Sequence, residues 1–316
     1  MIITPAAIAY GCLSFLALLF SAGLFALAAP RFYGGQQVDR GSGFVLLLAL
    51  GQAALVVRLL AWPALYAMFA SYVGLVKGSM CVYGVTQSIP ALTKTLEVLE
   101  PAAFLVSGAT LLLLGAYRGG STRVTARVVL RHMAVAALLS LVASLVGLAF
   151  LFAPKQTQEV SCCSAVTDSA VQRGPTGLVL EGPAARLVLP LTQSCALLLL
   201  LVQVWQLAAP APRRQFVAGG IAVLHLAFAL AALFGPIAPV LTGSPDHHCA
   251  YCLVAPRNAP YGLGGVGLVL LTLATAAPIW LARLARYGEA DRPRFRLAAV
   301  LALIGFWALV LVPYYR

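Results

Sequence analysis

Residues 132–153 read HMAVAALLSLVASLVGLAFLFA, an apolar stretch of 22 residues without an acidic residue, a lysine or an arginine. A helix needs about 20 apolar residues to cross the hydrocarbon core of a bilayer. This stretch therefore predicts a membrane-spanning helix. Similar stretches recur along the chain, and the predicted spans are residues 6–29, 43–61, 101–117, 132–153, 187–209, 216–240, 262–282 and 297–313.

The composition places the whole chain in the membrane class. Of its 316 residues, 61% are hydrophobic and only 9% are charged, whereas a soluble domain averages about 25% charged residues. We expect an all-α, polytopic membrane helical bundle with about eight transmembrane helices, forming a single integral membrane domain over residues 1–316. The apolar run 64–75 is interpreted as a separate re-entrant or interfacial piece before the third span.

The distribution of basic residues predicts the orientation of the bundle. Thirteen lysines and arginines lie in residues 30–42, 118–131, 210–215 and 283–296, whereas the other loops and the C-terminus hold seven, together with six of the nine acids. Short cytoplasmic loops carry the excess of positive charge. We therefore expect both termini and the alternate loops to be extracytoplasmic, in a bacterial cytoplasmic membrane. The net charge of +12 is explained by this pattern, so no nucleic-acid partner is expected.

Five of the seven cysteines fall in three predicted extracytoplasmic loops, at about residues 76–100, 154–185 and 241–260. These cysteines are Cys81, Cys162, Cys163, Cys249 and Cys252. Thiols outside the cytoplasm tend to become disulfides, and a C-x-x-C pair favours an exchanging thiolate. The other two, Cys12 and Cys195, lie inside predicted helices and are expected to be small buried hydrophobic residues.

Three hypotheses account for this cysteine set. The first is a thiol–disulfide oxidoreductase, in which the odd number of cysteines suits a relay with changing partners. The second is a copper- or zinc-binding transport or delivery protein, because thiolate and imidazole suit these metals. Its ligands would be His247, His248, Cys249 and Cys252. The third is a membrane subunit of a respiratory or transport complex, with disulfides that brace its outer loops.

The motif Cys249-Ala250-Tyr251-Cys252 and its predicted side of the membrane resemble membrane thiol oxidoreductases of the DsbB and vitamin K epoxide reductase kind. That resemblance implies a redox pair at Cys249 and Cys252, with Cys81, Cys162 and Cys163 as shuttle cysteines. It also implies a quinone as electron acceptor and extracytoplasmic thiol proteins as partners. Those families have four or five spanning helices rather than eight, so the resemblance covers only the motif and its side.

Arg58 and His225 lie inside predicted spans, where an ionisable group is a candidate functional site. Arg58, placed toward the outer end of the second span, is interpreted either as a quinone contact or as a side chain that reaches the interface or pairs with Glu97 or Glu100. His225 is expected to bond a neighbouring helix. The candidate partners of His225 are Gln193, Gln203 and Gln206. The chain has no C-x-x-C-H sequence, so no c-type haem is expected.

Overall fold

The computed structural model describes residues 2–33, 42–77, 79, 82–120, 124–155, 185–243, 250–253, 267–287 and 293–315. Helices are the regular structure of these residues, and no strand occurs among them. Seven helices are long and apolar enough to cross a membrane, and an eighth apolar helix is shorter. The predicted all-α polytopic bundle of about eight helices is confirmed.

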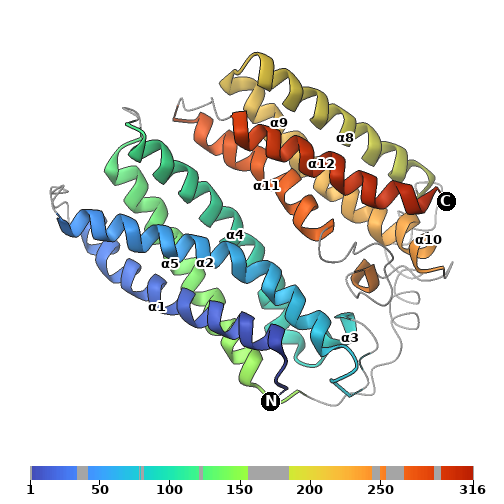
Figure 1. Cartoon of the computed structure of the whole chain (residues 1–316), viewed down its shortest axis with the longest axis horizontal. Coiled ribbons are helices and arrows are strands. Elements are labelled where there is room, and N and C mark those ends of the chain that lie inside the picture. The colour runs from blue at the N-terminus through green and yellow to red at the C-terminus, as the bar shows by residue number, and fades with distance from the viewer. Residues whose placement is uncertain are drawn as a thin grey trace. The chain divides into compact units, whose positions relative to one another are not determined.

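The chain divides into two compact units, each described here by itself. The N-terminal unit consists of residues Met1–Ser71, Ile89–Gln156 and Tyr287–Glu289. Its helices are drawn blue to green in Figure 1: α1 (Pro5–Tyr33), α2 (Ser42–Tyr72), α4 (Pro90–Arg118) and α5 (Ala126–Phe152). The expectation of one membrane domain over residues 1–316 stays a prediction.

The C-terminal unit consists of residues Tyr72–Ser88, Thr157–Arg286 and Ala290–Arg316. Its described elements are α3 (Val82–Gln87), α8 (Ala185–Ala208), α9 (Pro212–Ala232), the π-helical turn η2 (Leu233–Ile237), α10 (Ala238–Thr242), the 3₁₀ turn η3 (Ala250–Leu253), α11 (Leu268–Ala285) and α12 (Pro293–Tyr314). Buried alanines and leucines of α8, α9, α11 and α12 form its core.

The second span is longer than predicted. α2 continues through Pro63 to Tyr72, so the separate piece expected at 64–75 is instead the end of this helix. A proline removes one backbone hydrogen bond. Ending the helix in lipid would leave several backbone groups without partners, so a continuous helix is favoured.

The third span begins earlier than predicted. α4 starts at Pro90 and runs through Pro101, because proline suits the first turn of a helix, where its missing N–H is not needed. The expected loop at 76–100 therefore contains α3 and the first turns of α4. This shift places Glu100 inside a membrane-spanning helix rather than in a loop.

The helices of the N-terminal unit approach closely at glycines. α5 packs against α1 and α4. A Cβ on Gly51 would lie 1.9 Å from Cε of Met133, and a Cβ on Gly147 would lie 2.2 Å from the Tyr10 hydroxyl oxygen. Small residues at helix interfaces are the usual way for membrane helices to pack, and these two contacts tie α5 to α2 and α1.

The long helix that leads to the C-x-x-C segment has a defined end. α9 continues through η2, which contains Pro236, into α10. Gly243 then adopts a left-handed conformation with φ of 67°, which glycine tolerates without steric cost and which ends many helices. The chain leaves the helix here, and the next described element is η3.

Candidate functional site

The structure describes one of the five loop cysteines. Cys252 lies in η3 and is buried, with 4% of its surface exposed. The other cysteines and histidines of the predicted site lie outside the described residues: Cys81, Cys162, Cys163, His247, His248 and Cys249. Cys252 therefore locates this candidate site in the structure.

The turn that holds Cys252 contacts two other short elements of the C-terminal unit. η3 packs against α10 and against α3, and the three elements belong to the same compact unit. α3 begins at Val82, the residue directly after Cys81. Two segments more than 160 residues apart in the sequence, each beginning or ending beside a cysteine, thus meet at one place.

The remaining described cysteines lie in helices. Cys12 is exposed on α1, so its expected burial is wrong, and Cys195 on α8 is partly buried. Since Cys12 lies within an apolar spanning helix, its exposed side chain would face lipid. Within the described ranges, no three histidine, cysteine or acidic residues are grouped so that they could hold a metal ion. Most of the predicted ligand set falls outside these ranges.

A second candidate site lies in the N-terminal unit, where two opposite charges are fully buried. Nη2 of Arg58 on α2 forms an ion pair with Oε2 of Glu100 on α4, and both side chains are 0% exposed. A charged group inside a membrane is costly and is retained where it is paired or functional. The attraction between the two charges offsets part of that cost, and the pair joins α2 to α4.

Two further helices complete this network. The Tyr10 hydroxyl of α1 donates a hydrogen bond of 3.1 Å to Oε1 of Glu100. Arg58 donates through Nη1 to the Ser144 hydroxyl of α5 at 3.4 Å. Both acceptors and donors are buried, so all four long helices of the unit contribute one polar side chain to one charged centre.

The position of Arg58 differs from the sequence interpretation. Arg58 lies near the middle of α2, because the helix extends to Tyr72, and its side chain is fully buried within the protein. The alternative in which it pairs with Glu100 is confirmed. The quinone contact stays a prediction. Arg58 Nε has no hydrogen-bond partner among the described residues.

His225 shows the corresponding arrangement in the C-terminal unit. It lies on α9, is 0% exposed, and its Nε2 accepts a 3.0 Å hydrogen bond from the indole N–H of Trp307 on α12. The expectation that His225 bonds a neighbouring helix is confirmed, but its expected glutamine partners are wrong. Trp307 gives no signal of this bond in the sequence, because an indole inside an apolar run resembles any other hydrophobic residue although it carries one donor.

Arg296 is a buried residue that sequence reasoning missed. The sequence predicts it in a cytoplasmic loop, but it lies in the first turns of α12, is 0% exposed, and donates to the Gln206 carbonyl of α8 at 2.8 Å. Gln206 lies near the end of α8, where helix carbonyls carry partial negative charge. A loop boundary predicted from charge alone cannot distinguish such a buried arginine from an exposed one.

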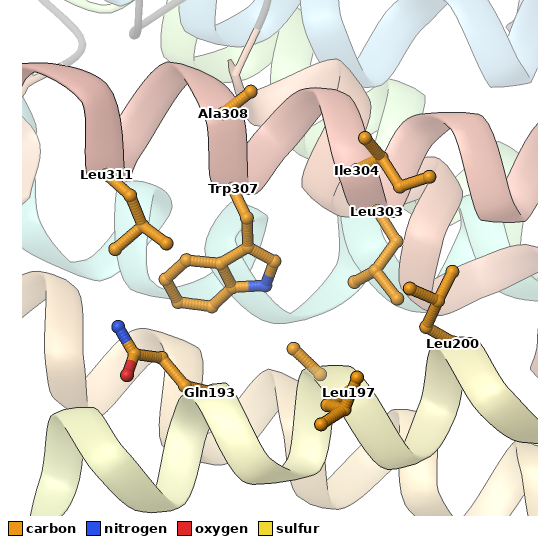
Figure 2. A pocket seen from close by; sticks show the side chains of 9 residues that line it. Gln193, Leu197, Leu200, Leu303, Ile304, Trp307, Ala308 and Leu311 are labelled. Atoms are coloured by element: carbon orange, nitrogen blue, oxygen red, sulfur yellow. The ribbon is translucent and has the colours of Figure 1, made fainter.

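An open, mostly apolar groove runs between α8 and α12 (Figure 2). Its volume is about 400 Å³, and the Trp307 indole stands between the two helices with the Gln193 amide opposite. Leu197 and Ile304 at its edge are about half exposed. In a bilayer, lipid chains would cover this face. The groove is lined by Gln193, Ala196, Leu197, Leu200, Leu303, Ile304, Trp307, Ala308 and Leu311.

Comparison of the chain with models of protein families, with curated proteins and with solved structures finds no match in any of the three. Two sites are defined by the chain's own residues. The first is a cysteine-bearing end of the C-terminal unit, suited to thiol chemistry. The second is a charged centre in the N-terminal unit, whose groups can hold or move a proton.

Proposed function

We propose that the chain is a membrane thiol–disulfide oxidoreductase that transfers electrons from extracytoplasmic thiols to a quinone. Cys249 and Cys252 would be its redox pair, and Cys81, Cys162 and Cys163 its shuttle or resolving thiols. The observation that carries the proposal is the contact between η3 and α3. A disulfide relay needs successive cysteines with Cα atoms within about 7 Å, and this contact supports such a neighbourhood for Cys252 and the segment of Cys81.

The burial of Cys252 supports a division of labour within the pair. A buried thiol in apolar surroundings is a poor nucleophile, and Cys252 is 4% exposed. Incoming thiols would therefore react at Cys249. Cys252 would be the leaving thiolate when the oxidised pair is attacked. In the reverse direction it would be the thiol that attacks the mixed disulfide from within the protein.

The proposed reaction balances over one dithiol substrate. A substrate thiolate attacks the sulfur of Cys249 in the oxidised pair, breaks the Cys249–Cys252 bond and forms a mixed disulfide. The second substrate thiolate then attacks the substrate sulfur of that mixed disulfide, releases the substrate disulfide and leaves both cysteines reduced. Quinone accepts two electrons and two protons from them, so that the pair becomes a disulfide again and hydroquinone forms.

Trapping of the mixed disulfide tests the proposal. We expect Cys252→Ser to keep a substrate thiol bound to Cys249, because Cys249 still reacts and the internal resolving thiol is lost. The purified full chain would be incubated with a disulfide-bonded peptide, quenched with acid and alkylated. Peptide mass spectrometry would then locate the adduct, with bound metal measured on the same sample. Cys195→Ser in α8 is the matched control, since its thiol lies in a membrane helix.

An adduct at Cys249 in Cys252→Ser, absent in Cys195→Ser and in Cys249→Ser/Cys252→Ser, supports the proposal. Stoichiometric copper or zinc that is lost in Cys249→Ser, without any adduct, would establish the metal-binding alternative instead. If all loop cysteines stay in disulfides under mild reductant, with neither adduct nor metal, the disulfides are structural braces and the proposal is wrong.

A further inference from the structure

The interior of the N-terminal unit differs on the two sides of the Arg58–Glu100 pair. Four buried serines continue from the pair along three helices: Ser14, Ser21, Ser107 and Ser140. The hydroxyl groups of Ser21, Ser107 and Ser140 have no hydrogen-bond partner among the described residues, and the Ser14 hydroxyl lies within reach of the Tyr10 hydroxyl. A helical serine can bond the carbonyl four residues earlier, as Thr110 bonds the Val106 carbonyl at 2.7 Å. None of the four serines makes such a bond, so each hydroxyl keeps hydrogen-bonding capacity that the described residues do not use.

The spacing places these serines on the faces that carry the network residues. Ser14 and Ser21 lie four and eleven residues after Tyr10, and Ser107 lies seven after Glu100. Ser140 precedes Ser144 by four residues. Because steps of four, seven and eleven return to the same face of an α-helix, each hydroxyl is in line with the residue that joins the charged centre.

All three helices carry their serines toward the same end of the unit. α1 and α5 are antiparallel. Tyr10, near the start of α1, lies against Gly147, near the end of α5, whereas Leu24, later in α1, and Met133, early in α5, both lie close to Gly51 of α2. α4 ends at the depth of Gly51, Leu24 and Met133, because its last residue Arg118 bonds Gln52 of α2. The file of hydroxyls thus leads from Glu100 toward the Met133 level of the unit.

The other side of the charged centre is closed by large apolar groups. Leu65, Met68 and Phe69 of α2 and Leu96 of α4 are each at most 1% exposed. Phe69 also packs edge to face against the fully buried Phe150 of α5, with ring centroids 5.4 Å apart. On this side, α1, α4 and α5 offer no described hydroxyl without a hydrogen-bond partner. The unpartnered polar atom here is the Trp62 indole nitrogen of α2, one turn beyond Arg58.

We propose that ordered water occupies the serine-lined half of the N-terminal unit and gives water and protons one-sided access to the Glu100 carboxylate. Buried water is held where about two to four polar groups can bond it. The Arg58 Nε and the hydroxyls of Ser14 and Ser140, one helical turn beyond Tyr10 and Ser144, supply such groups near the pair. Ser107 and Ser21 continue the file. Glu100 is its acidic end, faced by Arg58 and Tyr10. By the predicted orientation, the open end faces the cytoplasm.

This inference is independent of the thiol chemistry proposed above and can be tested without a variant. Hydroxyl radicals made from water by a short X-ray pulse modify side chains beside internal water. Two methionines of this unit form a matched pair, since Met133 and Met68 are both 0% exposed but lie on opposite sides of Glu100. In the full chain in lipid nanodiscs, with peroxide quenched, we expect Met133 and Tyr10 to be modified several-fold faster than Met68.

Equal modification rates at Met133 and Met68, after correction for dose, would overturn the proposal. A Ser107→Ala/Ser140→Ala variant supplies the second readout, because it removes two of the groups that would hold the water. We expect its Met133 rate to fall to the Met68 rate. An unchanged Met133 rate in this folded variant would also overturn the proposal, and if the variant does not fold, the wild-type comparison decides alone.

Discussion

The two units bury polar groups in different ways. In the N-terminal unit, Arg58 lies near the middle of a long helix and is paired with an opposite charge, Glu100, from another helix. In the C-terminal unit, the buried Arg296 lies near a helix start and bonds a backbone carbonyl of α8. The polar contact near the middle of the helices of the C-terminal unit, between His225 and Trp307, joins two neutral side chains.

The difference follows from depth. Near the end of a helix, carbonyl groups without intrahelical partners offer partial negative charge to a cation. Near the middle, the backbone is already satisfied within the helix, so a cation there needs a side chain of opposite charge. The comparison predicts that interhelical side-chain contacts are strong in the N-terminal unit and weak in the C-terminal unit.

The largest effect is expected from the buried ion pair. Removing one charge, in Arg58→Met or in Glu100→Gln, should lower the free energy of unfolding by about 3–5 kcal/mol, because the other charge is left buried and unpaired. The double variant Arg58→Met/Glu100→Leu should recover most of this loss. Equilibrium unfolding in detergent micelles measures all three variants. A double variant that is as unstable as the sum of the single ones would contradict the pairing.

A smaller effect is expected where α5 approaches α1. Gly147→Ala should destabilise the chain by about 1–3 kcal/mol through overpacking, since the new methyl group would collide with the Tyr10 hydroxyl and displace it from Glu100. Gly115→Ala on α4 is the matched control, because nothing lies within 4 Å of its added Cβ. Thermal unfolding should separate the two variants, and equal midpoints would show that Tyr10 is not held there.

The contact of the C-terminal unit should be the weakest of the three. A double-mutant cycle of His225→Leu and Trp307→Phe should give a coupling energy of about 0.6 kcal/mol, the average for hydrogen bonds between membrane helices. The cycle separates the pair from the packing that each substitution changes. A coupling energy as large as that of Arg58 and Glu100 would remove the contrast between the units.

Lys155, which follows α5, adds a pH dependence of stability. Burial lowers the pKa of its amine from 10.5 to about 8, and the amine lies 4.0 Å from the Phe150 ring centroid. Between these two pKa values the unfolded chain binds more protons, so the free energy of unfolding should rise with pH in this window. Peptide-resolved acylation of Lys155 should show a midpoint near pH 8. A midpoint near 10.5 would contradict the burial.

The sequence was sufficient for the number and kind of the helices, because membrane spans are set by runs of apolar residues such as 132–153. It misplaced their ends. α2 and α4 continue through Pro63 and Pro101, and a hydropathy run breaks at such prolines and at the polar residues beside them. Because Glu100 is charged, the sequence predicts it as the last residue of a loop before the span that begins at 101.

The sites were less predictable than the fold. Arg58 stood out as a charge within an apolar run, and its pairing with Glu100 was one of the stated alternatives. Its other partners, Tyr10 and Ser144, lie on helices that are distant in sequence, and neither residue type is unusual in a membrane helix. The contact of η3 with α3 likewise depends on tertiary packing, which neither local spacing nor composition reveals.

The central claim, thiol chemistry beside η3, is tested most directly by dithiol-dependent quinone reduction by the purified chain in lipid vesicles. The account predicts one hydroquinone per substrate disulfide formed. It also predicts that the reaction is lost in Cys252→Ser and kept in Cys195→Ser. Quinone reduction that is equally fast in Cys252→Ser and in the wild-type chain, or that does not occur with any dithiol, would contradict it.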